Sequence, residues 1–285
     1  MNQKQQYIPE EYWQKRLSKN FSLAGVGHLR LGFEYNIWLY RARLYALRKI
    51  LKRINLNCQG VRLLDIGVGT GFYIDFWKKS GVKDITGIDI TTKSIEELKR
   101  KYPDYKFIKA DIGDKNISLD EKFDIITAFD VLFHIVKEDT FEEAIRNIKK
   151  FSHNNTIILI MDNFLKECKQ AQGHENDRTL EYYKKILNSN SIEIKDIKPI
   201  FFFMNTPVDI ERIDNKIVKF MIKAMWRINK QANWYFKKMG TIGKGMSYFW
   251  ALILYSFDRL ILHFTSVGPS TKLLVAGLTQ QTETQ

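Results

Sequence analysis

The stretch Asp65-Ile66-Gly67-Val68-Gly69-Thr70-Gly71 decides the fold of this chain. The apolar run 61–64 before it is typical of a buried strand, and the segment 72–79 after it is typical of a helix. Glycines allow a sharp turn and a close approach of the backbone to a ligand, and a helix start offers unpaired N–H groups. Strand, turn and helix together predict a cradle for a nucleotide-like ligand.

The spacing of the glycines argues against a dinucleotide ligand. A dinucleotide site needs the pattern G-x-G-x-x-G, but the position three residues after Gly69 is the bulky Phe72. Instead, Asp65 ends the strand and glycines occupy every second position. This pattern resembles motif I of the class I S-adenosylmethionine (SAM) dependent methyltransferases. In that family the acid neighbours the cationic amino-acid half of SAM, and no pyrophosphate has to be held.

Three further strand ends follow in the order typical of the same family. Asp89 ends the strand predicted at 83–89, Asp111 follows the strand at 105–110, and Asp130 follows the strand at 123–128. A carboxylate at the end of the second strand can accept both ribose hydroxyls, and the resemblance implies that the acid after the third strand lies at the adenine amino group. The resemblance therefore implies a SAM site formed by Asp65, Gly67, Gly69, Thr70, Gly71, Asp89, Ile90, Asp111, Ile112 and Asp130.

Strands and helices alternate along the middle of the chain, which predicts parallel strands joined by crossover helices. A fifth strand is expected near 155–161, a sixth at 192–204 and a seventh at 271–278. The expected fold is α/β: a doubly wound, mostly parallel seven-stranded sheet of the Rossmann-like methyltransferase type, with an N-terminal helical cap and a helical insertion between strands six and seven. Crossover helices are predicted near 72–80, 92–101, 131–150 and 176–188.

The positive charge of the chain lies outside the predicted core. The net charge is +13, and the core at 61–206 carries 23 Lys/Arg against 24 Asp/Glu. The N-terminal cap at 1–60 has 11 against 3, and the insertion at 207–265 has 10 against 4. Such basic appendages indicate an anionic substrate, a membrane surface or nucleic acid, or only a solvated surface. The final strand of the core is placed at 266–280, and 281–285 is expected to be a disordered tail.

The insertion combines a basic amphipathic segment, 213–239, with an apolar one, 246–264. The apolar segment barely reaches the length of a membrane span, and the pair Asp258-Arg259 near its middle argues against one. Two alternatives stay open. The insertion is a substrate cap or a dimer contact with its aromatic side chains packed on the core, which is the favoured interpretation, or it lies at a membrane interface.

Methyl transfer from SAM is an in-line displacement, so the enzyme mainly has to align the acceptor and exclude water. Where the acceptor is a hydroxyl, a histidine is the natural base. His134, just after the fourth strand, is the candidate for this role, on the first turn of the following helix, and a structural or ligand-orienting role for it is the favoured alternative. No Asp-Asp or Asp-Asn pair is placed for a divalent ion, so no metal is expected. The candidates for acceptor binding are His28, Tyr35, Phe133, Asn163 and His174.

The function predicted from the sequence is a SAM-dependent methyltransferase that acts on a hydroxyl of a sugar, glycolipid or other small molecule. The N-terminal region 21–41 resembles methyltransferases of bacterial polysaccharide and lipid-linked sugar gene clusters. A nucleic-acid methyltransferase is a weaker alternative, because no Pro-Pro-aromatic motif follows the fourth strand. A non-catalytic SAM-binding scaffold is another. Two lone cysteines and the absence of a signal peptide predict a cytoplasmic protein, with contact to the inner face of the membrane left open.

Overall fold

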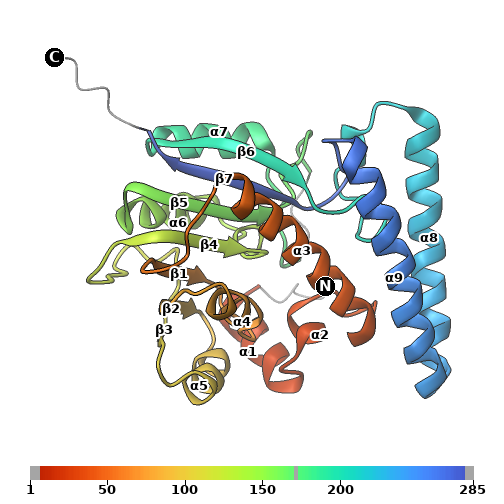
Figure 1. Cartoon of the computed structure of the whole chain (residues 1–285), viewed down its shortest axis with the longest axis horizontal. Helices are drawn as coiled ribbons and strands as arrows, with labels where there is room; N and C mark the ends of the chain where they lie inside the picture. Colours follow the sequence, from red (N-terminus) through yellow and green to blue (C-terminus); the bar gives the residue numbers. More distant parts are fainter. Residues whose placement is uncertain (1–6, 170–172, 280–285) are drawn as a thin grey trace, which may run out of the picture.

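A seven-stranded sheet runs through the protein in the computed structural model, which describes residues 7–169 and 173–279. The strands lie in the order β3-β2-β1-β4-β5-β7-β6 (Figure 1). Only β7 is antiparallel to its neighbours, β5 and β6. This confirms the predicted fold class. The strands are β1 (Arg62–Ile66), β2 (Asp84–Asp89), β3 (Lys106–Lys109), β4 (Phe123–Phe129), β5 (Ser152–Asp162), β6 (Ile192–Pro199) and β7 (Lys272–Leu278).

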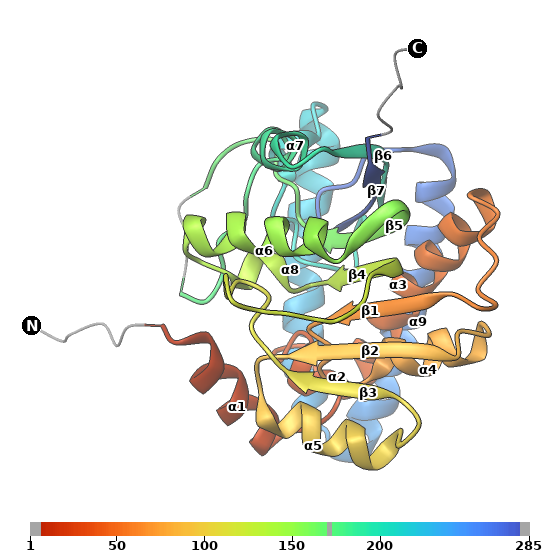
Figure 2. The same ribbon diagram turned by 90° about the vertical axis from the view of Figure 1, so that its left-hand side faces the viewer.

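Helices cover both faces of the sheet (Figure 2). The central strands are apolar on both sides, as in parallel sheets generally, so that Leu63 of β1 belongs to one core and Leu64 to the other. One face carries α3, α4 and α5, and the other carries α6 and α7. The helices up to β6 are α1 (Pro9–Lys19), α2 (Leu23–Val26), α3 (Phe33–Arg53), α4 (Phe72–Lys79), α5 (Thr92–Lys101), α6 (Glu138–Lys150) and α7 (Leu180–Ser189).

The structure corrects three of the predicted elements. The helix expected at 131–150 is a short 3-10 turn, η1 (Leu132–His134), followed by α6. The cause is Arg178, whose guanidinium donates to the carbonyls of Leu132 and Ile135 and so holds an extended connection between the two helices. Arg178 itself precedes α7 instead of lying inside it, and β6 ends at Pro199, earlier than expected.

The chain between β6 and β7 forms a helical hairpin at one side of the sheet (Figure 1). After a short 3-10 turn, η2 (Ile210–Arg212), it consists of α8 (Lys216–Lys238) and α9 (Gly240–Phe264), and α9 packs against both α3 and α8. No helix in the described part of the chain is both long and apolar enough to cross a bilayer. The exact division into segments at 60, 206, 265 and 280 stays a prediction, and the tail 281–285 lies outside the described residues.

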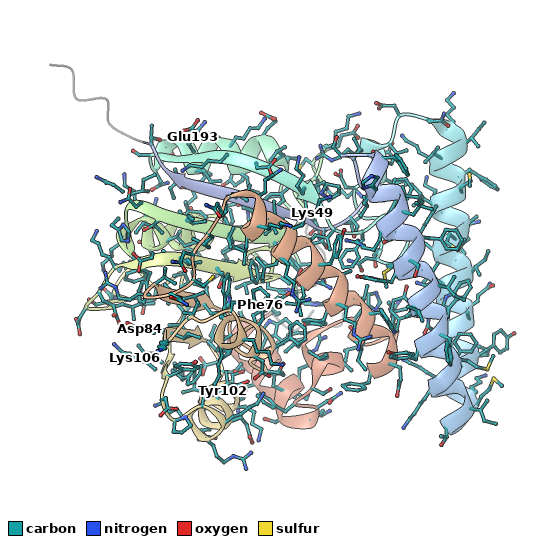
Figure 3. The ribbon with its side chains drawn as sticks, in the orientation of Figure 1. Lys49, Phe76, Asp84, Tyr102, Lys106 and Glu193 are labelled. Atoms are coloured by element: carbon teal, nitrogen blue, oxygen red, sulfur yellow. The ribbon has the colours of Figure 1, made fainter. Side chains whose placement is uncertain are left out.

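The amino ends of the parallel strands lie on one side of the molecule, and their carboxyl ends lie on the opposite side. Asp84 and Lys106, the first residues of β2 and β3, lie together at one edge of the molecule (Figure 3). The carboxyl ends of β1, β2, β3 and β4 meet at the other edge, because parallel strands point the same way. Ligands of doubly wound sheets bind at this second edge.

Candidate active site

A cavity of about 370 Å³ lies at the carboxyl ends of the strands. Its floor is the glycine-rich turn after β1 and the residues that follow β2, β3 and β4, and α1 with the residues before it lies across it. Its size falls within the range typical of small-molecule sites. The predicted site residues that line it are Gly67, Gly69, Thr70, Asp89, Ile90, Asp111, Ile112, Asp130 and His134.

Glycines in the turn have backbone conformations that other residues rarely adopt. Gly67 has φ +70°, and a Cβ there would lie 2.3 Å from Cγ2 of Val131. Gly71 has φ +76° and caps the start of α4, where a Cβ would lie 2.5 Å from Cδ2 of Leu98. Gly67 therefore brings bare backbone to the cavity. Gly71 does not line it, so its predicted cofactor contact is corrected to a structural role in the turn.

Three hydrogen bonds fix the carboxylate of Asp89, which lines the cavity. Its Oδ2 accepts from the backbone N–H of Gly69 at 2.9 Å, and its Oδ1 accepts from the N–H and the hydroxyl of Thr91 at 2.8 and 2.7 Å. These bonds fix the carboxylate and tie the end of β2 to the glycine-rich turn. A carboxylate has about four acceptor positions, so it can accept further hydrogen bonds from a ligand in the cavity.

Two other acids line the cavity. Asp111 accepts from the N–H of Gly113 at 2.8 Å, which fixes the turn after β3. Asp130 has φ +58°, an uncommon conformation for a residue with a side chain, and forms an ion pair of 2.6 Å with Nε of Arg43 from α3. Because Arg43 is nearly buried, this pair anchors the N-terminal helices to the end of β4.

Asp65 does not line the cavity. Its side chain is buried, and its Oδ1 accepts from the hydroxyl of Thr127 on the neighbouring strand β4 at 2.6 Å. Burial raises the pKa of this carboxyl to about 7. Asp65 and Thr127 are register partners on neighbouring strands, so their side chains lie on the same face of the sheet. A direct contact of Asp65 with the ligand stays a prediction.

His134 lines the cavity from the turn after β4. Its Nδ1 lies 3.0 Å from the backbone carbonyl of His174, which can only accept, so Nδ1 carries the proton and Nε2 keeps its lone pair. Burial lowers the pKa of His134 to about 3. The ring is therefore neutral at physiological pH, with one free acceptor nitrogen.

The residues predicted for acceptor binding lie outside the cavity lining. Tyr35 is fully buried, and its hydroxyl bonds the carbonyl of Met204 and the side chain of Asn229. The remaining four are engaged elsewhere. His28 packs edge-on against Trp226, Asn163 bonds Asp177 and Thr271, Phe133 packs against His134, and His174 holds the ring of His134 through its carbonyl.

One group of side chains near the cavity has the composition of a metal site. Nitrogen and oxygen atoms of His134, His174 and Glu175 lie within 4.8 Å of one another. The two imidazole rings are stacked at 5.2 Å with an angle of 10° between their planes. Ring lone pairs lie in the ring plane, so stacked rings do not direct them to a common point. These residues could hold an ion only after a ring rotates.

Aromatic side chains that the sequence analysis missed form much of the cavity wall. Tyr40 from α3, Tyr73 from α4 and Phe129 from β4 lie in a row, with ring centroids 6.2 and 4.7 Å apart. Trp13 from α1 packs edge-on against His134 at 4.9 Å. Aromatic faces beside carboxylates suit a ligand that carries a positive charge. Tyr73 lies in the helix directly after the glycine-rich turn, whereas the other aromatic side chains come from distant parts of the sequence.

Comparison with known proteins agrees with this geometry. A family model described as a methyltransferase domain matches residues 63–154, the segment from β1 into β5 that supplies the floor of the cavity. The chain therefore contains a methyltransferase domain of the class I SAM-dependent type. A ubiquinone/menaquinone biosynthesis C-methyltransferase from Campylobacter jejuni is 23% identical to the methyltransferase over 192 residues, which cover 60% of this chain and 79% of the relative.

Solved structures support the fold of the methyltransferase. The [4+2]-cyclase SpnF is similar with a TM-score of 0.51 at 18% identity, over 83% of this chain and 80% of that one. A SAM-dependent methyltransferase from Clostridium acetobutylicum has a TM-score of 0.47 at 14% identity, over 56% and 83%. Because a cyclase shares the fold, the fold alone does not identify the reaction or the acceptor.

The cavity of the methyltransferase fits SAM. Bare backbone at Gly67 leaves room for the ligand, and Asp89 and Asp111 present fixed carboxylates at the ends of adjacent strands. SAM supplies a methyl group on a cationic sulfur, and the aromatic row with Asp130 offers a surface that favours such a cation.

Proposed function

We propose that this methyltransferase transfers the methyl group of SAM to a hydroxyl of a small amphiphilic acceptor, such as a lipid-linked sugar, and that it works at the inner face of the membrane. The observation that supports a hydroxyl acceptor is that His134 lines the cavity and carries its proton on Nδ1, so that Nε2 keeps a lone pair. The aromatic wall supports an acceptor with an apolar or ring-shaped part, which can lie flat on such side chains.

In this proposal the residues of the chain have separate tasks. Asp89, Asp111 and the turn at 67–70 hold SAM, and Asp130 lies beside its methyl end. Trp13 and the segment before it cover the cavity and exclude water, which strengthens the electrostatic contacts inside. Nε2 of His134 accepts a hydrogen bond from the acceptor hydroxyl and aligns its oxygen with the methyl group. Its low pKa favours alignment over removal of the proton.

Replacing His134 tests this alignment. We expect His134→Ala to lower kcat by roughly 10- to 100-fold, the effect of a misaligned acceptor, with little change in SAM affinity. His134→Gln, which keeps an acceptor atom, recovers part of the loss. Since the wild-type ring is neutral at physiological pH, its rate shows no inflection between pH 5 and 8 from this histidine. An inflection near pH 6.5 that disappears in His134→Ala contradicts this role.

A second candidate is transfer to carbon. The C-methyltransferase relative and the aromatic wall favour a flat ring as the acceptor. SAM with a carbon-13 methyl group distinguishes the two, because the chemical shift of the transferred methyl differs between oxygen and carbon.

The acceptor class is tested with purified protein, methyl-tritiated SAM and a cell extract separated into lipid, saccharide, nucleic-acid and small-molecule fractions. The proposal predicts label in the lipid or saccharide fraction. Label in nucleic acid contradicts it and restores the nucleic-acid alternative. SAM binding without transfer to any fraction favours a non-catalytic scaffold.

A further inference from the structure

The hairpin α8–α9 buries several polar side chains beside apolar ones such as Trp226 and Leu254, and it exposes many other apolar side chains. Asn229 and Asn233 of α8 and Ser247 of α9 are buried between the helices and joined by hydrogen bonds of 2.8–2.9 Å. Asp258 of α9 is also buried. A surface helix usually buries its apolar face and turns polar side chains to solvent, so buried polar groups beside exposed apolar ones depart from the usual pattern.

The outer face of α9 is a continuous apolar stripe. Its members follow helical spacing over the whole helix, a length of about 33 Å at 1.5 Å per residue. Ile242 at one end is 72% exposed, Phe249 in the middle 64% and Phe264 at the other end 80%. Exposed apolar surface of this extent marks an interaction site. The stripe consists of Ile242, Met246, Phe249, Ile253, Phe257, Leu260 and Phe264.

The partner of the stripe is anionic. Between 216 and 257 the sequence has eight Lys/Arg and no Asp/Glu. One face of α8 carries basic side chains at helical spacing with an aromatic side chain near each end, and Nζ of Lys238 lies 3.3 Å from the ring centroid of Trp234. This face carries Phe220, Lys223, Arg227, Lys230, Trp234 and Lys238.

We infer that the α8–α9 hairpin is a membrane-binding element that rests its apolar stripe in the interface of a bilayer containing anionic lipid. Exposed aromatic and aliphatic side chains enter the boundary between headgroups and acyl chains, and the lysines and arginine bind the headgroups. A second copy of the protein would cover the apolar stripe but would not account for the excess of Lys/Arg between 216 and 257. Nucleic acid would account for the positive charge but not for the apolar stripe. Some aromatic side chains of the hairpin, such as Trp226, pack on the core as the favoured sequence interpretation expected, and others, such as Phe249, are exposed. No hairpin residue lines the described cavity, and the choice between a substrate cap and a dimer contact stays a prediction.

This inference rests on the membrane location in the proposed function and extends it. Its test does not measure methyl transfer, so the membrane inference and the proposed reaction can be contradicted separately. Full-length protein is sedimented with vesicles of phosphatidylcholine, with or without phosphatidylglycerol. We expect it to bind the vesicles with phosphatidylglycerol and to bind less as salt rises. Phe249→Ser with Phe257→Ser, and Lys223→Glu with Lys230→Glu, should each lower the partition coefficient by roughly tenfold or more.

The controls make comparable changes at residues outside the hairpin. Leu29→Ser removes an exposed apolar side chain, and Lys99→Glu with Lys185→Glu reverses the same charge on α5 and α7. These variants should bind vesicles like wild type. All variants should keep SAM affinity, which shows that they fold.

Three results overturn the inference. The first is that wild-type protein stays in the supernatant with both kinds of vesicle. The second is a wild-type dimer by light scattering that Phe249→Ser with Phe257→Ser converts to monomer, with no vesicle binding, because the stripe then covers a second copy. The third is salt-sensitive retention of the protein on DNA or RNA, unaffected by the serine variant and without vesicle binding.

Discussion

Replacing Asp89 with alanine is expected to lower the affinity for SAM by at least roughly tenfold, because hydrogen bonds to a charged group contribute about 1.5–3 kcal/mol. The carboxylate is the acceptor for the ribose hydroxyls in this account. It also holds the N–H of Gly69 and the residue Thr91, so the change loosens the turn that carries the ligand. Isothermal titration of SAM into purified protein measures the effect.

Two variants make this result specific. Asp89→Asn keeps one carbonyl oxygen and should bind SAM with intermediate affinity. Asp84→Ala removes an exposed acid at the opposite end of the same strand and should bind like wild type (Figure 3). If Asp89→Ala binds SAM as tightly as wild type, the site has been assigned to the wrong residues.

Replacing Asp258 with alanine is expected to lower the free energy of unfolding by about 3 kcal/mol or more, because it leaves buried backbone donors without partners. The carboxylate accepts from the N–H groups of Phe202, Phe203 and Met204 at 2.9, 2.7 and 3.3 Å. These three hydrogen bonds join α9 to the chain after β6. Urea unfolding followed by circular dichroism measures the change, and the exposed Asp214→Ala serves as a control with little effect.

The pKa of Asp258 gives a second test of the same site. Burial, opposed by the backbone hydrogen bonds, raises this pKa from 3.8 to about 6. A carboxyl whose pKa is raised on folding contributes most below its unfolded pKa, and the contribution falls as pH rises through the folded value. Wild type should therefore lose stability relative to Asp258→Asn between about pH 4 and pH 6. A constant difference across this range contradicts the burial of an ionising carboxyl.

The sequence predicted the floor of the cavity well because that floor is encoded locally. Asp89 and Asp111 follow apolar strands, and parallel strands bring their ends together whatever the rest of the chain does. The hydrogen bond between Asp65 and Thr127 joins two strands that are far apart in the sequence, so the local pattern does not show it. His134 was found, but the carbonyl of His174 that fixes its tautomer comes from 40 residues away.

The surroundings of the residues predicted for acceptor binding depend on contacts that the local sequence does not encode. Tyr35 is buried because α8 and the chain after β6 pack over it, and such contacts depend on how the hairpin docks. The apolar segment at 246–264 had the composition of a buried helix, and only the structure separates its inner face from its outer one. The presence of Asp258 in this segment was evidence against a membrane span. In the structure its carboxylate accepts three backbone hydrogen bonds, which accounts for an acidic residue in an apolar helix.

Hydrogen–deuterium exchange with and without SAM tests most directly the claim that the cavity holds the cofactor. The account predicts slower exchange on SAM binding in the turn at 66–70, in the strand ends at 88–90 and 110–112, and in α1 across the cavity. The hairpin α8–α9 should show little change, because none of its residues lines the described cavity. Protection confined to other parts of the chain, or no protection while SAM is bound, would contradict the account.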